Sequence, residues 1–149
     1  GFIYTVEGDS LEGRIKVKAL YDKKVSYIPD GQKKKRNIPV RKIEAMRINL
    51  MQYGKVEINN TPKLLEKVAY GRYNLYAYAQ AYKDQVKTFY YFEFDKNEVI
   101  QLNRENYLRV LEYYLIDVPE IEKALYNEEV AFEDVVQLVR NYNQRILKN

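Results

Sequence analysis

Hydrophobic and polar residues alternate through much of the first two-thirds of the chain, with the period of half-buried β-strands. The alternation in residues 2–6 and 14–19, interrupted by a turn at Gly8-Asp9-Ser10, predicts an N-terminal β-hairpin. In the second segment we expect the apolar side chains to face the core and the intervening Arg and Lys side chains to face solvent.

Three more short strands are predicted at residues 24–28, 42–50 and 53–59. The first of them ends at the turn Pro29-Asp30-Gly31, where proline presets φ and glycine accepts a positive φ.

The segment 61–71 allows two interpretations. Thr61 as an N-cap, Pro62 in the first helical position and Gly71 as terminator indicate a short helix. Val68 and the tyrosines that follow it indicate a strand, which is the interpretation that we prefer.

The segment 71–94 is rich in tyrosine and holds six of the 16 tyrosines of the chain. Residues 72–82 and 86–94 predict two long antiparallel strands, the central hairpin of the sheet. Alternation along the first strand places leucine and alanine on one face and Tyr76, Tyr78 and Tyr82 on the other.

After Asn103 the apolar residues recur with the period of an α-helix. Three apolar stripes follow, at Tyr107, Val110, Leu111, Tyr114 and Leu115, then at Ile121, Ala124 and Leu125, and last at Phe132, Val135, Val136, Val139 and Tyr142. Pro119 precedes the second stripe and suits a first helical turn.

Strands followed by helices predict an α+β fold. We expect an N-terminal antiparallel β-sheet or open barrel of about six to eight strands, followed by two or three C-terminal helices. A single domain is predicted over residues 1–149, mainly β in residues 1–102 and mainly α in residues 103–149.

Four segments resemble a family of exported domains of unknown function from Bacteroidetes. "GFIYTVEGDSLEGRIKV" resembles the opening hairpin of that family, G-[YF]-[IV]-x-T-x-x-G-D-[ST]-[LI]-x-G-x-I, which follows a signal peptide. "LLEKVAYGRYNLYAY", "TFYYFEF" and "LVRNYN" resemble its later segments. The resemblance implies export to the periplasm or the cell surface, and it implies no activity and no catalytic residues.

Composition excludes several classes of chemistry. The chain has no Cys and no His, so thiol nucleophiles, histidine-based triads and Cys/His zinc sites are absent. It has neither a P-loop nor a dinucleotide-binding glycine motif, and no calcium-loop motif. We therefore expect no enzyme activity, no cofactor and no metal. In addition, no apolar run in the sequence is long enough to span a membrane.

The net charge of +4 is unevenly distributed, at +6 in residues 1–62 and −3 in residues 103–149. A run of six cations without an acid occupies residues 31–43, at Lys33, Lys34, Lys35, Arg36, Arg41 and Lys42. These six side chains are candidates for binding nucleic acid, an anionic polysaccharide or lipid headgroups. The alternative is a solvated loop whose charge protects a strand edge from pairing.

The aromatic face of the tyrosine hairpin is the second candidate surface. Tyr76, Tyr78 and Tyr82 would contact a ligand or a protein partner if they are exposed, since tyrosine has an apolar ring and a polar tip. The alternative is that they are ordinary cross-strand aromatic residues of the sheet.

Carboxylates offer a weaker candidate. Glu93 and Asp95 lie two residues apart, and Glu7 and Asp9 flank the first turn, but no spacing singles out the acid pair of a hydrolase. We accordingly expect a non-catalytic exported domain of the envelope or cell surface, which binds an unknown protein or has a structural role. A polyanion-binding module that uses residues 33–42 is the alternative, and a carboxylate-based hydrolase is a remote one.

Overall fold

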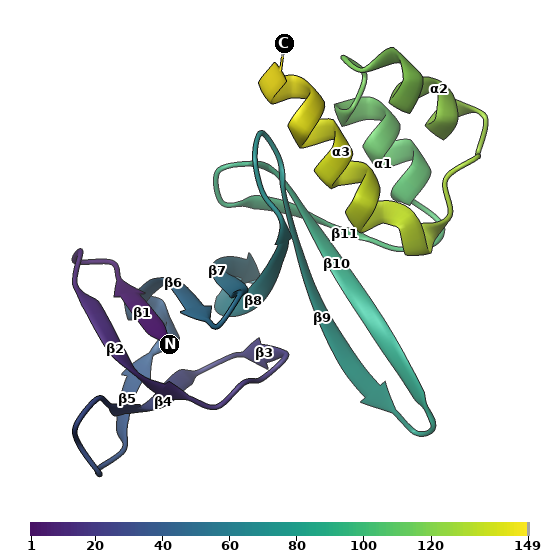
Figure 1. Cartoon of the computed structure of the whole chain (residues 1–149). Coiled ribbons are helices and arrows are strands. Elements are labelled where there is room, and N and C mark those ends of the chain that lie inside the picture. The colour runs from purple at the N-terminus through teal and green to yellow at the C-terminus, as the bar shows by residue number, and fades with distance from the viewer. Residues whose placement is uncertain (149) are drawn as a thin grey trace. The chain divides into compact units, whose positions relative to one another are not determined.

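The computed structural model describes the backbone of residues 1–148 and the side chains of residues 1–147, with strands first and helices last (Figure 1). The strands are β1 (Phe2–Thr5), β2 (Ser10–Ile15), β3 (Leu20–Tyr21), β4 (Lys24–Pro29), β5 (Arg36–Pro39), β6 (Ile43–Ile48), β7 (Met51–Ile58), β8 (Thr61–Ala69), β9 (Asn74–Tyr82), β10 (Gln85–Asp95) and β11 (Glu98–Leu102). The helices are α1 (Tyr107–Tyr114), α2 (Pro119–Tyr126) and α3 (Val135–Lys148), with the 3₁₀ turns η1 (Val40–Lys42) and η2 (Phe132–Asp134). The predicted α+β fold is confirmed.

The sheet has eleven strands, more than the sequence predicts. Their order is β11-β10-β9-β8-β7-β6-β1-β2-β4-β5, with β3 paired to β8. The strands missing from the prediction are short: β3 has two residues, β5 has four and β11 has five. β3 is too short to display an alternating pattern, and the residues of β5 (RNIP) and β11 (EVIQL) do not alternate strictly between polar and apolar.

The chain divides into two compact units, and β8, β9 and β10 contribute to both. The first unit comprises Gly1–Lys67 and Tyr78–Val86, and the second comprises Val68–Ala77 and Lys87–Asn149.

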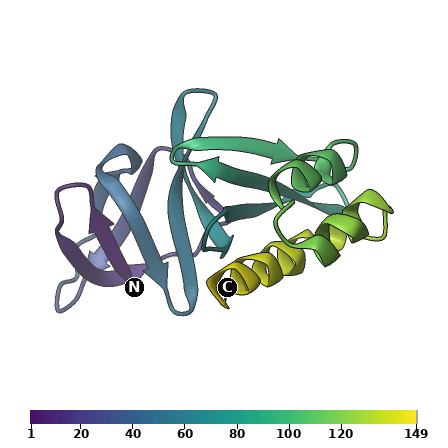
Figure 2. The same cartoon turned by 90° about the horizontal axis from the view of Figure 1, so that it is seen from above.

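The first unit is a strongly curved antiparallel sheet. Its strand β3 follows β2 in the chain yet pairs with β8, as Leu20 opposite Leu65 and Tyr21 opposite Leu64, so the strands turn round a shared interior (Figure 2). The buried residues of this interior are Ile3, Tyr21, Val25, Tyr27, Val40, Ile43, Met46, Ile48, Tyr53 and Leu64. The rings of Tyr21 and Tyr53 meet edge to face at 5.5 Å between centroids.

Gly13 is the point at which β2 changes partners. Residues 10–12 of β2 pair with β1, and residues 13–15 pair with β4. A Cβ on Gly13 would run into the carbonyl oxygen of Ile28 and would lie 3.0 Å from the ring of Tyr27. A glycine is therefore needed where the two backbones approach most closely.

The first hairpin is confirmed, but the limits of its second strand are corrected. Ser10 already pairs with Tyr4, so the turn occupies residues 6–9, with Gly8 at φ +95°. The strand ends at Ile15, and Val17 is 49% exposed where the alternation predicted burial. Tyr21 accounts for the departure, because its hydroxyl donates to the carbonyl of Lys16 and accepts from the amide of Lys18.

The segment 61–71 forms a strand as far as Ala69, so the preferred interpretation is confirmed. The long hairpin is also present, as β9 and β10 joined by Lys83 and Asp84. Its predicted place at the centre of the sheet is wrong, because only β11 lies beyond it and the hairpin is near one edge. Lys83 has a φ of +57°, as a tight hairpin turn requires.

The second unit packs its helices against strands. All three predicted apolar stripes are confirmed, because each contains a residue that is almost fully buried: Leu111, Leu125 and Val139. They share a core with Leu75 of β9, Phe92 of β10 and Leu102 of β11, among others. No helix among the described residues combines the length and apolar character needed to cross a membrane.

We predict that Gly13→Ala lowers the free energy of unfolding by about 2 kcal/mol, since the added methyl group must push apart two hydrogen-bonded strands. Urea denaturation followed by circular dichroism measures the change. Ser10→Ala, at an exposed position of the same strand, is the control and should be close to neutral. Equal stability of the two variants would show that the crossing at Gly13 tolerates a side chain.

Candidate functional site

The predicted basic segment lies on the surface of the first unit, where β5 divides it. Lys33, Lys34 and Lys35 lie in the β4–β5 loop and Arg36 begins β5, and all four are exposed. Arg41 and Lys42 follow β5 in η1 and are also exposed. The intervening strand is four residues long, which separates its ends by about 10 Å. One run of sequence thus becomes two groups of cations.

The group beyond β5 is larger than the sequence indicated. Lys23 and Lys24 join it, because the amide of Val40 donates to the carbonyl of Lys23 at 2.9 Å and Lys24 pairs with Pro39. Lys55 of β7 joins it as well, with its Nζ 3.3 Å from the carbonyl oxygen of Arg41. We call this set, Lys23, Lys24, Arg41, Lys42 and Lys55, the turn cluster.

The group before β5 gains one cation from β2. Arg14 is exposed and lies opposite Ile28, two residues before the loop begins. We call this set, Arg14, Lys33, Lys34, Lys35 and Arg36, the loop cluster. Two acidic residues lie nearby, Glu12 on β2 and Asp30 in the loop. The backbone amide of Asp30 donates a hydrogen bond to the backbone carbonyl of Glu12 at 3.2 Å. The loop cluster therefore keeps an excess of positive charge.

Pairing across strands explains why the sequence did not reveal Arg14, Lys23, Lys24 and Lys55. These residues approach the basic run only through the register of β2, β4, β5 and β7. The doublet Lys23-Lys24 just before an alternating strand was a usable signal, because a β-hairpin returns its last residues to the start of its first strand.

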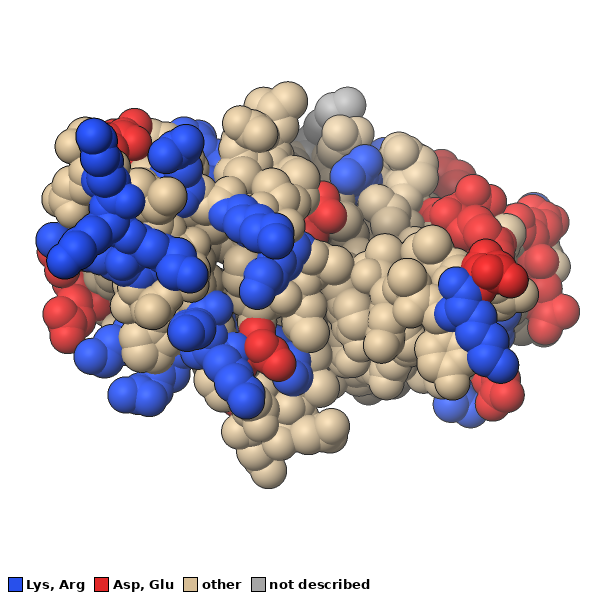
Figure 3. Space-filling view, turned by 90° about the horizontal axis from the view of Figure 1, so that it is seen from below, with Lys and Arg blue, Asp and Glu red and all other residues tan. Residues whose placement is uncertain are grey.

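The side chains of both clusters are largely unpaired. Over the part of the chain that the structure describes, the ion pairs involve Arg72, Arg104 and Arg145, all in the second unit. The first unit has sixteen Lys and Arg against nine Asp and Glu, a net charge of +7, and the second unit has −3. Figure 3 shows Lys and Arg gathered over the strands of the first unit and Asp and Glu over the helices.

The three candidate tyrosines do not share one environment. Tyr76 is 3% exposed and Tyr78 is half-buried, whereas Tyr82 is 61% exposed near the end of β9. The opposite face shows the same gradient, from buried Leu75 to exposed Ala81. The structure therefore does not place Tyr76, Tyr78 and Tyr82 together on one exposed surface.

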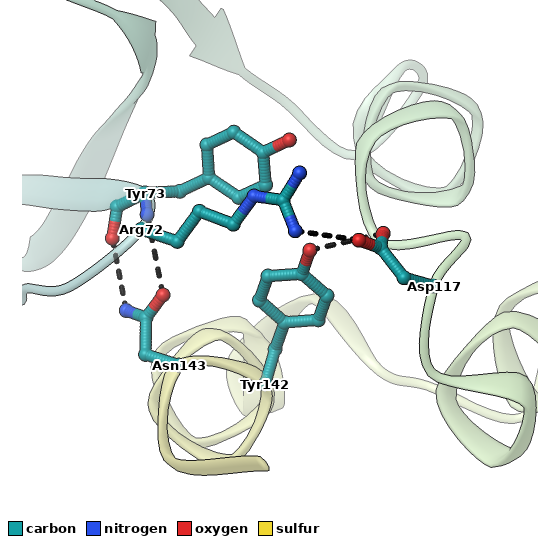
Figure 4. A network of polar contacts seen from close by, with 5 residues as sticks. All are labelled: Arg72, Tyr73, Asp117, Tyr142 and Asn143. Atoms are coloured by element: carbon teal, nitrogen blue, oxygen red, sulfur yellow. Dashed lines mark hydrogen bonds and ion pairs between the residues drawn. The ribbon is translucent and has the colours of Figure 1, made fainter. Parts of the chain in front are cut away.

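A polar network in the second unit escaped the sequence analysis (Figure 4). The side chain of Asn143 on α3 binds both backbone groups of Tyr73, donating to its carbonyl oxygen at 2.9 Å and accepting from its amide at 3.2 Å. Asn143 is only 3% exposed. A Cβ on Gly71, whose φ is +150°, would lie 2.7 Å from Cγ of Asn143, so the glycine makes room for the amide.

The network continues through an ion pair. Arg72 donates to Asp117 at 2.5 Å, and the hydroxyl of Tyr142 donates to the other carboxylate oxygen at 3.1 Å. Arg72 also lies over the ring of Tyr73, 5.7 Å from its centroid. Residues from the β8–β9 loop, the α1–α2 connection and α3 are thereby joined.

The pKa shifts within this network favour a structural role for its residues. Burial alone would raise the pKa of Asp117, but the hydrogen bonds from Tyr142, its own backbone amide and Arg72 hold that pKa below its ordinary value. The pKa of Tyr142 is raised chiefly by burial, and the hydrogen bond to Asp117 raises it further. The pKa of Glu133 is also lowered, chiefly by its hydrogen bond from Arg104. A general acid needs a shift in the opposite direction.

We predict that Asn143→Ala lowers the free energy of unfolding by about 2 kcal/mol, because it leaves the amide and carbonyl of Tyr73 without partners in a mostly buried place. Denaturation midpoints measure it. The matched control is Asn141→Ala, an exposed asparagine on the same helix, which should cost less than about 0.5 kcal/mol. Similar losses in both variants would contradict a specific role for Asn143.

We predict a pH dependence from Asp117. Its folded pKa is lowered, so its contribution to stability is present above the pKa of an unfolded Asp, about 4, and is lost as pH falls through the folded value. Asp117→Asn should destabilise the protein at neutral pH by about 1 kcal/mol or less, since the pair is partly exposed, and the deficit should shrink at pH about 3. Urea midpoints at both pH values measure it, with Glu105→Gln as control. A constant deficit would contradict the prediction.

No protein-family model, no curated protein and no solved structure matches the chain. The resemblance to exported Bacteroidetes domains therefore stays a prediction from the four quoted segments.

Proposed function

We propose that this protein is a non-catalytic binding module for a linear anionic polymer, which it contacts through the loop cluster and the turn cluster. One observation carries the proposal: the two clusters lie at opposite ends of β5, about 10 Å apart along the strand. A single small anion can engage only one of them. A polymer with anionic groups along its length can engage both.

The energetics also favour a polymer. Each exposed ion pair contributes little by itself, about 0 to 1 kcal/mol, because water screens the charges. Many contacts along one chain add, and they release the counterions condensed on that chain. The strands of the curved sheet and the turns between them carry ten cations with few acids among them, which suits this kind of binding.

We propose an extracytoplasmic location, in the periplasm or at the cell surface. The resemblance of "GFIYTVEGDSLEGRIKV" to the opening of exported domains supports it. An anionic polymer of the cell envelope is then the natural ligand. Fractionation of cells that express the full-length gene product tests this location, and recovery of the protein in the cytoplasm alone would contradict it.

Binding of a protein partner is the second candidate. It is favoured by large apolar side chains that the helices leave exposed, Tyr113 at 73%, Ile116 at 60% and Tyr126 at 74%. Tyr113 lies in the last turn of α1, and Ile116 follows the end of that helix. The polymer remains the better supported ligand, because these residues are few and the cations are many. Chemical cross-linking in cells, with Tyr113→Ser and Ile116→Ser as comparisons, tests the partner surface.

We predict that the protein is retained on immobilised heparin and elutes with rising salt. Replacing Lys33, Lys34 and Lys35 by Ala should lower the eluting salt concentration clearly, because it removes three contacts to anionic groups. The matched control replaces three exposed cations of the second unit, Lys96, Arg109 and Lys123, by Ala. It changes the net charge equally and should elute close to the wild type.

Two results would contradict the proposal. One is passage of the wild-type protein through the heparin column at low salt. The other is an equal loss of retention in the two triple variants, which would mean that retention follows net charge and not the clusters. Replacing Lys23, Lys24 and Lys42 by Ala should reduce retention as well, since the turn cluster is proposed to act with the loop cluster.

A further inference from the structure

The surface between the two clusters has a specific polar character. Outward-facing residues along β4 are Lys24, Ser26 and Ile28, while Val25 and Tyr27 turn inward and are 0% and 5% exposed. Lys24 belongs to the turn cluster, and Ile28 lies opposite Arg14 of the loop cluster. Ser26 therefore lies midway between cations, about 7 Å from the β4 position on either side.

Ser26 is paired with an exposed asparagine. It lies opposite Asn37 on β5, and its hydroxyl donates to Oδ1 of Asn37 at 2.6 Å. This bond uses the carbonyl of the asparagine and the proton of the serine. The two N–H groups of Nδ2 and the lone pairs of Oγ remain to serve a ligand, since the described side chains offer them no other bond.

The same surface lacks a feature that single-stranded nucleic acid usually requires. Nucleic-acid grooves of this kind stack bases on exposed aromatic rings. Among the described residues, no aromatic side chain faces outward on β4 or β5, because Tyr27 is directed into the core. Phe2 and Tyr4 lie on β1, across β2 from this surface, and Arg47 covers the ring of Phe2 at 5.1 Å.

We propose that the anionic polymer is an acidic polysaccharide, whose carboxylates contact the two clusters while its hydroxyl groups bond to the Ser26–Asn37 pair. The inference rests on the proposed function. A sugar polymer offers both kinds of group in alternation: charge for the lysines and arginines, and neutral donors and acceptors for the hydroxyl–amide pair. Inorganic polyphosphate offers the charge and acceptor oxygens, which Nδ2 of Asn37 can also bond, but along its length it has no hydroxyl group to donate to Oγ of Ser26.

The test compares three probes at one low salt concentration: polygalacturonate, inorganic polyphosphate and single-stranded oligothymidylate. Dissociation constants are measured by calorimetry for the wild type, Asn37→Ala and Ser26→Ala. Gln52→Ala, an exposed amide on β7, is the matched control. We expect Ser26→Ala to weaken binding of polygalacturonate about five-fold, the value of one ordinary hydrogen bond, and to leave polyphosphate binding unchanged, because polyphosphate has no hydroxyl to donate to Oγ. Asn37→Ala should weaken polygalacturonate binding too, and the two effects should not add, because both act through one pair.

The outcomes separate this inference from the proposed function. Unchanged polyphosphate binding also shows that a variant is folded. If Ser26→Ala affects all three probes equally, or none, the acidic polysaccharide is wrong while the polymer-binding function stands. Tighter binding of oligothymidylate than of polygalacturonate, independent of Ser26, would replace it by a nucleic acid. If no probe binds the wild type, the proposed function fails as well.

Discussion

The first unit depends on the close approach of β2 and β4 at Gly13. Because no side chain is present there, one strand can pair with β1 through its first half and with β4 through its second half. That change of partner curves the sheet round its interior and brings β4 and β5 beside β2. Without it, Arg14 would not lie beside the β4–β5 loop. A steric constraint at one residue thus brings a cation of β2 to the loop cluster.

Local pattern was sufficient for most of the architecture. The helical stripes at Leu111, Leu125 and Val139 were predictable because a buried helix face repeats over several turns. The strands β7, β9 and β10 were also predictable, since each has eight or more residues in which alternation can show. β8 is as long, but Thr61, Pro62 and Gly71 also suit a short helix, so its sequence left two interpretations. The end of β2 was not, because the hydroxyl of Tyr21 captures Lys16 and Lys18 from a position that no local rule indicates. Short strands such as β5 are defined by their partners and not by their own residues.

The candidate surface was predictable only in part for the same reason. A run of lysines is visible in any sequence, so Lys33 to Arg36 were found at once. The sequence suggested that they form one group with Arg41 and Lys42. In the structure β5 separates those two residues from the lysines of the β4–β5 loop. Lys23 and Lys55 come close only through backbone pairing and a single contact to Arg41. The Asn143 network shows the same limit, since it joins positions 70 residues apart in the chain.

For the proposed polymer ligand, the separation of the two clusters would have a kinetic consequence. Cations at the two ends of β5 would act as linked binding groups, so a polymer segment held by one cluster would present its next charges to the other at high effective concentration. Either cluster could release while the other still held, which would slow complete dissociation far more than it would speed association. A protein built in this way would move along a polymer by successive partial releases and would rarely leave it.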